Sequence, residues 1–172
     1  MRKTTVLLAT AGTMLLLVTG IAFAATTINC KGGTCVGTNN EDRMRGTGGI
    51  DRMSGRGGND VMTGSYNADV MYGGEGLDTI NGDYGADKIS GNAGNDNLSG
   101  GPVGDEIYGG SGTEVVEGNA GDDFINVAGD NIKDSVSCGI GNDTAVVDGA
   151  DLGRQSFEDF VRLSSCEIVT VR

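Results

Sequence analysis

Gly37–Asn126 consists of ten nine-residue units without insertion: GTNNEDRMR, GTGGIDRMS, GRGGNDVMT, GSYNADVMY, GGEGLDTIN, GDYGADKIS, GNAGNDNLS, GGPVGDEIY, GGSGTEVVE and GNAGDDFIN. All ten units begin with Gly, nine carry Asp at position 6, and all ten carry an aliphatic residue or Met at position 8. Such a fixed short period predicts a solenoid, in which each unit buries its apolar side chain only by stacking on its neighbours.

The nonapeptide resembles the G-G-x-G-x-D-x-U-x repeat of RTX proteins, a calcium-binding parallel β-helix repeat. The resemblance rests on positions 1, 6 and 8 recurring together in register, and it covers a little over half of the chain. It implies an all-β fold, a right-handed parallel β-roll of about ten repeats followed by a small C-terminal cap. In this family two nonapeptides make one turn, so odd and even units are expected to build two opposed parallel sheets.

Each unit is expected to form a Gly-rich turn over its first six positions and a very short strand over its last three. Side chains alternate along a strand, so position 8 faces inward while positions 7 and 9 face outward. One sheet then contributes Met44, Met62, Ile80, Leu98 and Val116 to the core, and the other contributes Met53, Met71, Ile89, Ile107 and Ile125. A core with only one row of side chains from each sheet is thin and needs additional stabilisation. We interpret the Met residues as adaptable core side chains.

The resemblance implies several Ca²⁺ ions, each held between the loops of successive turns by position-6 carboxylates and by backbone carbonyls. Oxygen ligands of this kind suit Ca²⁺, which tolerates irregular geometry better than Mg²⁺ does. The position-6 residues form two edges: Asp42, Asp60, Asp78, Asp96 and Glu114 on one, and Asp51, Asp69, Asp87, Asp105 and Asp123 on the other. Asp60 with Asp78, and Asp78 with Asp96, have the most regular loops.

Two departures from the pattern are expected to disturb individual loops. Glu114 is one methylene longer than Asp, which weakens the case for the site that it shares with Asp96. Val103 follows Pro102 and occupies position 4, where Gly or Asn adopts a left-handed conformation more easily. As an alternative to calcium, the Asp residues would only form turns. Asp recurs at a single position of the unit, whereas Asn, Ser and Thr occupy other positions. This pattern favours calcium binding over turn formation alone.

Residues 1–24 have the pattern of an export signal, with two basic residues, an apolar stretch, and Ala22-Phe23-Ala24 before the predicted cleavage point. A membrane anchor is the alternative, but Thr and Gly interrupt the stretch, and no other apolar run is long enough to span a bilayer. The chain then divides into a signal peptide (1–24), an N-terminal cap with a Cys pair (25–36), the repeats (37–126) and a C-terminal capping segment with a second Cys pair (127–172).

In the C-terminal segment, the repeat register is expected to break from Val127 to Ser137 and to return briefly in a degenerate unit that begins at Cys138. Asp143 in this unit extends the second edge of metal ligands. Ser156 and Asp159 form a capping-box pattern that predicts a short amphipathic helix, and a final strand is expected after Cys166. The segment as a whole is expected to cover the last turn and to block edge-to-edge association.

Four cysteines in an exported chain favour disulfides over a thiolate metal site, and three pairings are possible in principle. Two cysteines precede the repeats and two follow them. Five turns stacked at about 4.8 Å place the two ends roughly 20 Å apart, far beyond the reach of a disulfide. The predicted bonds are therefore Cys30–Cys35 and Cys138–Cys166.

The formal net charge is −12, and removal of the signal, which carries two basic residues and no acid, changes it to −14. A chain so acidic, with no Trp and four Phe, repels itself and needs a counter-charge. The same charge argues against nucleic acid or an anionic membrane as a partner. The basic residues Arg43, Arg45, Arg52 and Arg56 cluster near the start of the repeats, but among acids, so a solvated end of mixed charge is expected.

Two pairs of side chains one turn apart are expected to meet on the outer faces. Tyr66 and Tyr84 should stack; contact of this pair with a glycan is the alternative, which the small size of the pair disfavours. Lys88 and Glu106 should form a pair across neighbouring strands.

Enzymatic activity is not expected. The chain has no His, which excludes a His-dependent triad and the HExxH zinc site, and it has no GxSxG motif. In RTX proteases, lipases and haemolysins the repeats accompany a separate catalytic or pore-forming domain, for which no residues remain here.

The sequence therefore predicts a secreted calcium-binding protein that serves as an extracellular structural or interaction module. Its expected partners are calcium ions and a cell-surface or extracellular protein or glycan. The alternative is an accessory, non-catalytic subunit of a secreted toxin or hydrolase. Ice binding, known for some calcium-dependent β-rolls, would need a regular row of Thr and Asn, which position 2 of the units does not provide.

Overall fold

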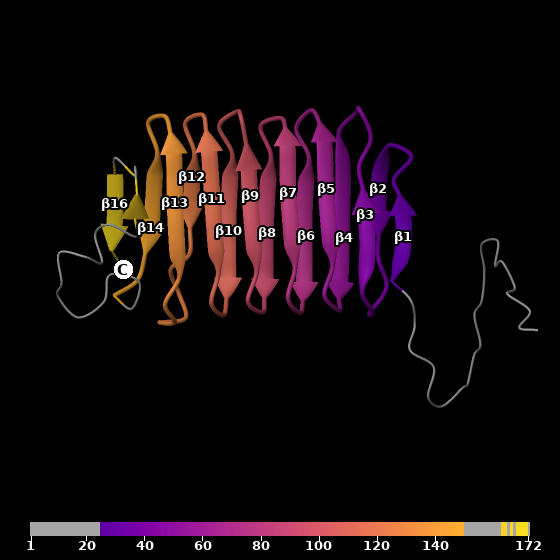
Figure 1. The fold of residues 1–172 in the computed structure, drawn as a ribbon, viewed down its shortest axis with the longest axis horizontal. Helices are drawn as coiled ribbons and strands as arrows, with labels where there is room; N and C mark the ends of the chain where they lie inside the picture. The colour runs from indigo at the N-terminus through magenta and orange to yellow at the C-terminus, as the bar shows by residue number, and fades with distance from the viewer. Residues whose placement is uncertain (1–24, 150–162, 165, 167, 172) are drawn as a thin grey trace, which may run out of the picture.

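The computed structural model describes residues 25–149, 163–164, 166 and 168–171. Within this part of the chain there is no helix, and sixteen short strands form two eight-stranded parallel sheets that face each other. The odd-numbered strands point up and the even-numbered strands point down, and the chain advances along one long axis from β1 to β16 (Figure 1). The expected β-roll is therefore confirmed.

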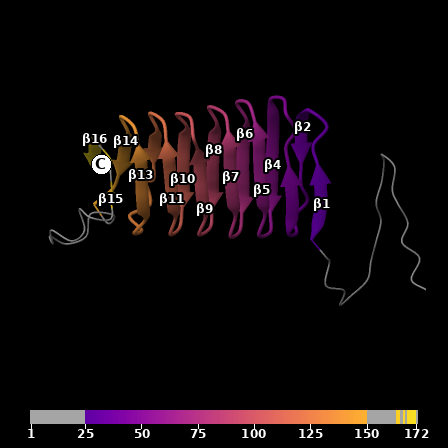
Figure 2. The same cartoon turned by 45° about the horizontal axis from the view of Figure 1, so that its top comes forward.

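The first sheet contains the odd-numbered strands β1 (Thr26–Asn29), β3 (Asp42–Arg45), β5 (Val61–Tyr66), β7 (Thr79–Tyr84), β9 (Asn97–Gly101), β11 (Val115–Ala120), β13 (Ser135–Ile140) and β15 (Leu163–Ser164). The second sheet contains β2 (Gly33–Val36), β4 (Asp51–Gly57), β6 (Val70–Glu75), β8 (Lys88–Ala93), β10 (Glu106–Ser111), β12 (Phe124–Asn126), β14 (Thr144–Val147) and β16 (Ile168–Val171). Figure 2 shows the same two layers after a turn about the long axis.

Within the repeats, residues that are eighteen positions apart pair with each other. Met62 pairs with Ile80, and Met71 pairs with Ile89. Two units thus make one turn, which places every position of the nonapeptide directly over its counterpart one turn earlier. Because of this register, residues at the same position of alternate units form straight columns of like side chains.

The predicted core is confirmed, because all ten position-8 residues are buried, with at most 2% of any side chain exposed. Burial of these columns between the sheets is the main apolar contribution to the fold. The core also includes residues outside the ten units. Among these are Cys35, which pairs with Met53, and Val127, Val136 and Ala145 toward the C-terminal end.

The roll is longer than the ten predicted units. Residues 25–36 form strands β1 and β2, which add a complete turn at the N-terminal end. The prediction that the register breaks through Ser137 was wrong. The inserted residues are only Val127 and Ala128, after which Gly129–Ser137 and Cys138–Val146 are two further units, and β13 pairs with β11 at an offset of twenty residues.

The predicted final strand is present as β16, which pairs with β14. The predicted helix around Ser156 and Asp159 and the predicted signal peptide, residues 1–24, lie outside the described residues.

Both disulfides form as predicted. Cys30, directly after β1, is bonded to Cys35 in β2, with their Cα atoms 5.5 Å apart, and Cys138 in β13 is bonded to Cys166 with a Cα separation of 5.1 Å. One bond lies at each end of the roll. Each sheet contributes only one row of side chains to the core, and each end turn has a neighbouring turn on one side only. These crosslinks therefore hold the end turns.

The expected pairs on the outer faces are also present. The rings of Tyr66 and Tyr84 stack, with centroids 5.4 Å apart and planes 9° from parallel. The Nζ atom of Lys88 lies 2.8 Å from Oε1 of Glu106. Both charged side chains are about half exposed, so this ion pair adds little to the stability of the fold.

Candidate metal sites

The position-6 residues form two columns, one along each long edge of the roll, as predicted. The first column holds Asp42, Asp60, Asp78, Asp96 and Glu114, and the second holds Asp51, Asp69, Asp87, Asp105, Asp123 and Asp143. Every one of these side chains is buried, with at most 4% exposed. Carboxylates are seldom fully buried unless a partner compensates their charge, so the columns need an explanation beyond turn formation.

One oxygen of most of these carboxylates belongs to a hydrogen-bonded ladder. The backbone N–H of Asp42 donates to Oδ1 of Asp60 at 2.8 Å, and the N–H of Asp60 donates to Oδ1 of Asp78 at the same distance. The same bond recurs from turn to turn in both columns. The ladder fixes the orientation of each carboxylate and leaves its second oxygen available for another partner.

That second oxygen is buried and has no hydrogen-bond partner. It is Oδ2 in Asp60, Asp69, Asp78, Asp87, Asp96, Asp105, Asp123 and Asp143, and Oδ1 in Asp42 and Asp51, the first members of the columns. Buried polar atoms are nearly always hydrogen-bonded, and an unpaired charged oxygen is especially unfavourable. A repeated set of such atoms, one per unit, indicates a missing positively charged partner.

Backbone carbonyls of the next turn lie beside the unpaired Oδ2 atoms of Asp60, Asp69, Asp78, Asp87, Asp96, Asp105 and Asp123. A methyl group built on Gly73, at position 1 of its unit, would lie 2.2 Å from Oδ2 of Asp78 and 2.8 Å from the carbonyl oxygen of Gly91. The equivalent methyl on Gly91 would lie 2.3 Å from Oδ2 of Asp96 and 2.6 Å from the carbonyl oxygen of Gly109. Position 1 therefore excludes any Cβ because carboxylate and carbonyl oxygens converge there.

Burial shifts the acidity of these groups strongly. It raises the pKa of Asp60, Asp69, Asp87, Asp96 and Asp123 from 3.8 to about 6, and that of Asp105 to about 7. The ladder hydrogen bonds oppose this effect, while neighbouring carboxylates of the same column add to it for all of these groups except Asp87. Without a cation, ionised columns are therefore unfavourable in the folded state.

The first column is irregular at Glu114. The described residues contain no ladder bond from Asp96 N–H to Glu114, and the carboxyl group of Glu114 is fully buried, with that of Asp134 as its hydrogen-bonding neighbour. Burial, followed by the charge of Asp134, raises the pKa of Glu114. The longer side chain thus interrupts the ladder between Asp96 and the last turns.

Asp134 is a buried column member that the sequence reasoning missed. Its Oδ1 accepts a hydrogen bond from Glu114 N–H at 2.8 Å, so it continues the first column. The signal was present, since Asp134 occupies position 6 and Val136 position 8 of a unit that begins at Gly129. The two-residue insertion before this unit concealed it.

The position-4 irregularity is visible in the backbone. Asn67 adopts a positive φ of 65°, as expected for a residue that tolerates the left-handed region, whereas Val103 is not among the described residues with positive φ. The strand β9 before it ends at Gly101, and its pairing with β11 extends no further.

The chemistry of these sites depends on combining side-chain and backbone oxygens. Among the described residues, no group of three or more His, Cys, Asp or Glu side chains is arranged to hold a metal. Each inter-turn site instead offers a few carboxylate oxygens and adjacent carbonyls, all of them hard donors. Such a set fits Ca²⁺, which accepts mixed carboxylate and carbonyl ligands, and fits poorly with metals that prefer nitrogen or sulfur.

Comparison with protein families matches the chain to the RTX calcium-binding nonapeptide repeat. Overlapping matches cover residues 36–71, 45–80, 63–98, 72–107, 91–125 and 108–131, which is more than half of the chain. The fold and the two columns define a class of protein, the repeat β-rolls with oxygen-rich sites between turns. The matched family belongs to this class. The chain is a member of the RTX calcium-binding nonapeptide repeat family. Searches of curated proteins and of solved structures found no match.

Proposed function

We propose that this protein is secreted and folds as a β-roll on binding several Ca²⁺ ions, and that it serves as an extracellular structural or interaction module. The observation that carries this proposal is the row of buried, unpaired carboxylate oxygens that converge with backbone carbonyls at position 1. Membership in a calcium-binding repeat family supports the same metal.

The residues that would hold the ions are the members of both columns, together with nearby carbonyl oxygens of the Gly-rich loops. A bound Ca²⁺ would supply the positive charge that the ionised carboxylates lack. For an affinity of about 10⁻⁴ M and calcium near 1 mM, each occupied site would add roughly 1.4 kcal/mol to the stability. Several such sites would amount to a large part of the stability of an ordinary domain.

An extracellular location is supported by the two disulfides and by the signal pattern of residues 1–24. The part of the chain that the structure describes contains no helix long and apolar enough to cross a membrane. Expression of the whole chain with its own leader tests the location. We expect a product that begins at Ala25 outside the cytoplasm, whereas an uncleaved chain that stays in the cytoplasm would contradict it.

We infer a non-catalytic role, since the acidic residues are used in regular columns and the chain has no His. The alternative, an accessory subunit of a secreted toxin or hydrolase, predicts that a catalytic protein co-purifies with it.

Calorimetric titration of the oxidised chain from Ala25 onward tests the metal-binding proposal. We expect several Ca²⁺ ions per chain and no comparable binding of Mg²⁺, because Mg²⁺ requires a regular octahedral site. Binding of no Ca²⁺, or equal binding of the two ions, would contradict the proposal.

A further inference from the structure

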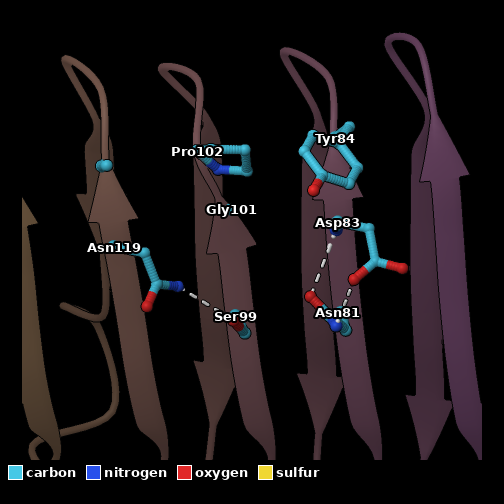
Figure 3. A pocket seen from close by; sticks show the side chains of 8 residues that line it. Asn81, Asp83, Tyr84, Ser99, Gly101, Pro102 and Asn119 are labelled. Atoms are coloured by element: carbon cyan, nitrogen blue, oxygen red, sulfur yellow. Dashed lines mark hydrogen bonds between the residues drawn. The ribbon is translucent and has the colours of Figure 1, made fainter.

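The outer face of the first sheet carries a hollow that the calcium columns do not explain. Its volume is about 390 Å³, and it lies over β7, β9 and β11. The residues that form it include Asn81, Asp83, Tyr84, Ser99, Pro102 and Asn119 (Figure 3). The hollow is shallow and largely open to solvent, so it could contact one face of a ligand but could not enclose it.

One side of the hollow is aromatic. Tyr84 stacks on Tyr66, and the two side chains are 59% and 58% exposed, although both are large and apolar over most of their surface. The stack holds the ring of Tyr84 in a fixed orientation. The face of an aromatic ring is electron-rich and attracts polarised C–H groups, so a fixed and exposed ring is suited to contact the C–H face of a ligand.

The other residues provide oriented polar groups. The amide of Asn81 donates to Oδ1 of Asp83 at 2.6 Å, and the amide of Asn119 donates to Oγ of Ser99 at 3.0 Å (Figure 3). These bonds fix both side chains on the strands. Oδ1 of Asn119 accepts none of the hydrogen bonds that fix this side chain, so it is available to a ligand, whereas the free oxygen of Asp83 points away from Ser99 and Asn119 (Figure 3).

Two of these polar residues occupy backbone positions that favour glycine. Asp83 has φ of 65° and Asn119 has φ of 79°, and Gly101 occupies the equivalent position on the strand between them with φ of 151°. Glycine adopts such angles without steric cost, whereas other residues do so less readily. Arg56, Ser65 and Asn92 occupy the same position of other units with positive φ, so this backbone angle is a feature of the repeat and is not confined to the hollow.

The tyrosine pair alone is too small to bind a glycan, but the polar side chains beside Tyr84 extend the surface, and we propose that this hollow binds a neutral saccharide. A pyranose ring would place its C–H face on Tyr84, and a hydroxyl group of the bound saccharide would donate a hydrogen bond to the free oxygen of Asn119. The negative charge of Asp83 and the net charge of −12 disfavour anionic sugars and nucleic acids. The proposal rests on the calcium-dependent fold proposed above, because strands from three successive turns form the hollow.

The test uses the calcium-loaded chain from Ala25 onward and four neutral probes: tetramers of β-1,4-linked glucose, β-1,3-linked glucose, α-1,4-linked glucose and β-1,4-linked mannose. Binding is measured by calorimetry and by tyrosine fluorescence, which is unobscured because the chain has no Trp. We expect at least one probe to bind. Substitution Tyr84→Ala should weaken its binding by about tenfold, the size of a good aromatic contact.

Two further variants separate binding from folding. Asn119→Gly should also weaken binding, and it should not disturb the backbone, because its φ of 79° is favourable for glycine. Tyr72→Ala removes a tyrosine that is 40% exposed on the second sheet, and it should leave binding unchanged.

The outcomes distinguish this inference from the proposed function. If circular dichroism shows a calcium-folded roll but no probe binds below about 10 mM, the saccharide site is wrong and the calcium function stands. Equal weakening by Tyr72→Ala and Tyr84→Ala would also overturn the site. If the chain does not fold with calcium, the proposed function itself fails.

Discussion

At the scale of single residues, positions 1 and 6 of the nonapeptide depend on each other. The carboxylate at position 6 turns inward and occupies the space beside the glycine at position 1, where any Cβ would meet it. The apolar residue at position 8 then fills the core between the sheets. These contacts explain why Gly, Asp and an apolar residue recur together in the sequence.

The pairing of positions 1 and 6 predicts a specific effect of adding one methyl group. Gly73→Ala would place Cβ 2.2 Å from Oδ2 of Asp78, so we expect a loss of about 1–3 kcal/mol in the free energy of unfolding with calcium present. Gly48→Ala is the matched control, because a Cβ there meets nothing within 4 Å. Urea unfolding measures both variants, and equal stability of the two would contradict the packing described here.

Replacing a column carboxylate should change stability in opposite directions with and without calcium. Asp78 is buried and its pKa is raised, mainly by burial, so its charge is unfavourable in the ion-free fold. Asp78→Asn should therefore stabilise the protein in chelator and destabilise it in about 1 mM calcium, where each lost site removes roughly 1.4 kcal/mol. Glu75→Gln, at an exposed position, is the control and should do neither. Thermal unfolding in chelator and in calcium measures the stability of each variant. A change in the stability of Asp78→Asn with the same sign in both buffers would contradict a metal role for Asp78.

The sequence predicted the members of the columns well, since a covalent period of nine residues determines which side chains stack. It could not predict that Oδ1 of a column carboxylate accepts a ladder bond while Oδ2 remains unpaired. The roles of the two oxygens depend on the distance and orientation between successive turns, which the sequence does not give. Asp134 escaped prediction because Val127 and Ala128 shift the period by two residues while the strands still pair.

At the scale of strands and loops, the two columns are rows of like charge on successive turns. Within one column, Asp60 experiences repulsion from both Asp78 and Asp42. The ladder bonds orient the carboxylates but do not neutralise them. The strands of each sheet can therefore stack closely only when protons or cations neutralise the negative charge of the carboxylates in the loops at their ends.

The pH dependence of the ion-free protein follows from this balance. The pKa of carboxyls such as Asp60, Asp69 and Asp96 rises from 3.8 to about 6 on folding. Protonation of these groups therefore favours the folded state. This contribution to the stability of the ion-free protein is fully present below pH 3.8 and is lost as the pH rises through about 6. In chelator we expect the β signal in circular dichroism to increase as the pH is lowered from 8 to 5. With calcium the trend should reverse, because protons compete for the same oxygens. A pH-independent signal in chelator would contradict the raised pKa values.

The disulfides should contribute unequally. The Cys138–Cys166 bond closes a separation of 28 residues, whereas Cys30–Cys35 closes one of only 5. Crosslinks over longer loops restrict the unfolded chain more, typically by about 2–4 kcal/mol in total. Replacing Cys138 and Cys166 together by Ala should therefore lower the free energy of unfolding more than the same change at Cys30 and Cys35. Urea unfolding in calcium compares the two variants, and the opposite order would contradict this expectation.

At the scale of the whole molecule, the fold is a linear array in which each turn contacts only its neighbours. The sequence predicted this architecture and the positions of both disulfides, since a fixed register sets the distance between the ends. It did not predict the turn formed by residues 25–36, which lacks the Gly and Asp pattern of the repeats. Ile28 pairs with Met44 and Cys35 with Met53, so inward-facing apolar residues extend the core there without a position-6 carboxylate.

We propose that calcium determines whether the array is folded. The thin core and the uncompensated columns argue that the ion-free chain cannot hold both sheets at neutral pH. Circular dichroism of the oxidised chain from Ala25 onward, titrated with Ca²⁺ from chelator to about 10 mM with Mg²⁺ as control, tests this most directly. We predict a cooperative gain of β signal with Ca²⁺ and none with Mg²⁺. A chain that is already folded in chelator and does not respond to Ca²⁺ would contradict the claim, and the Asp columns would then only shape turns.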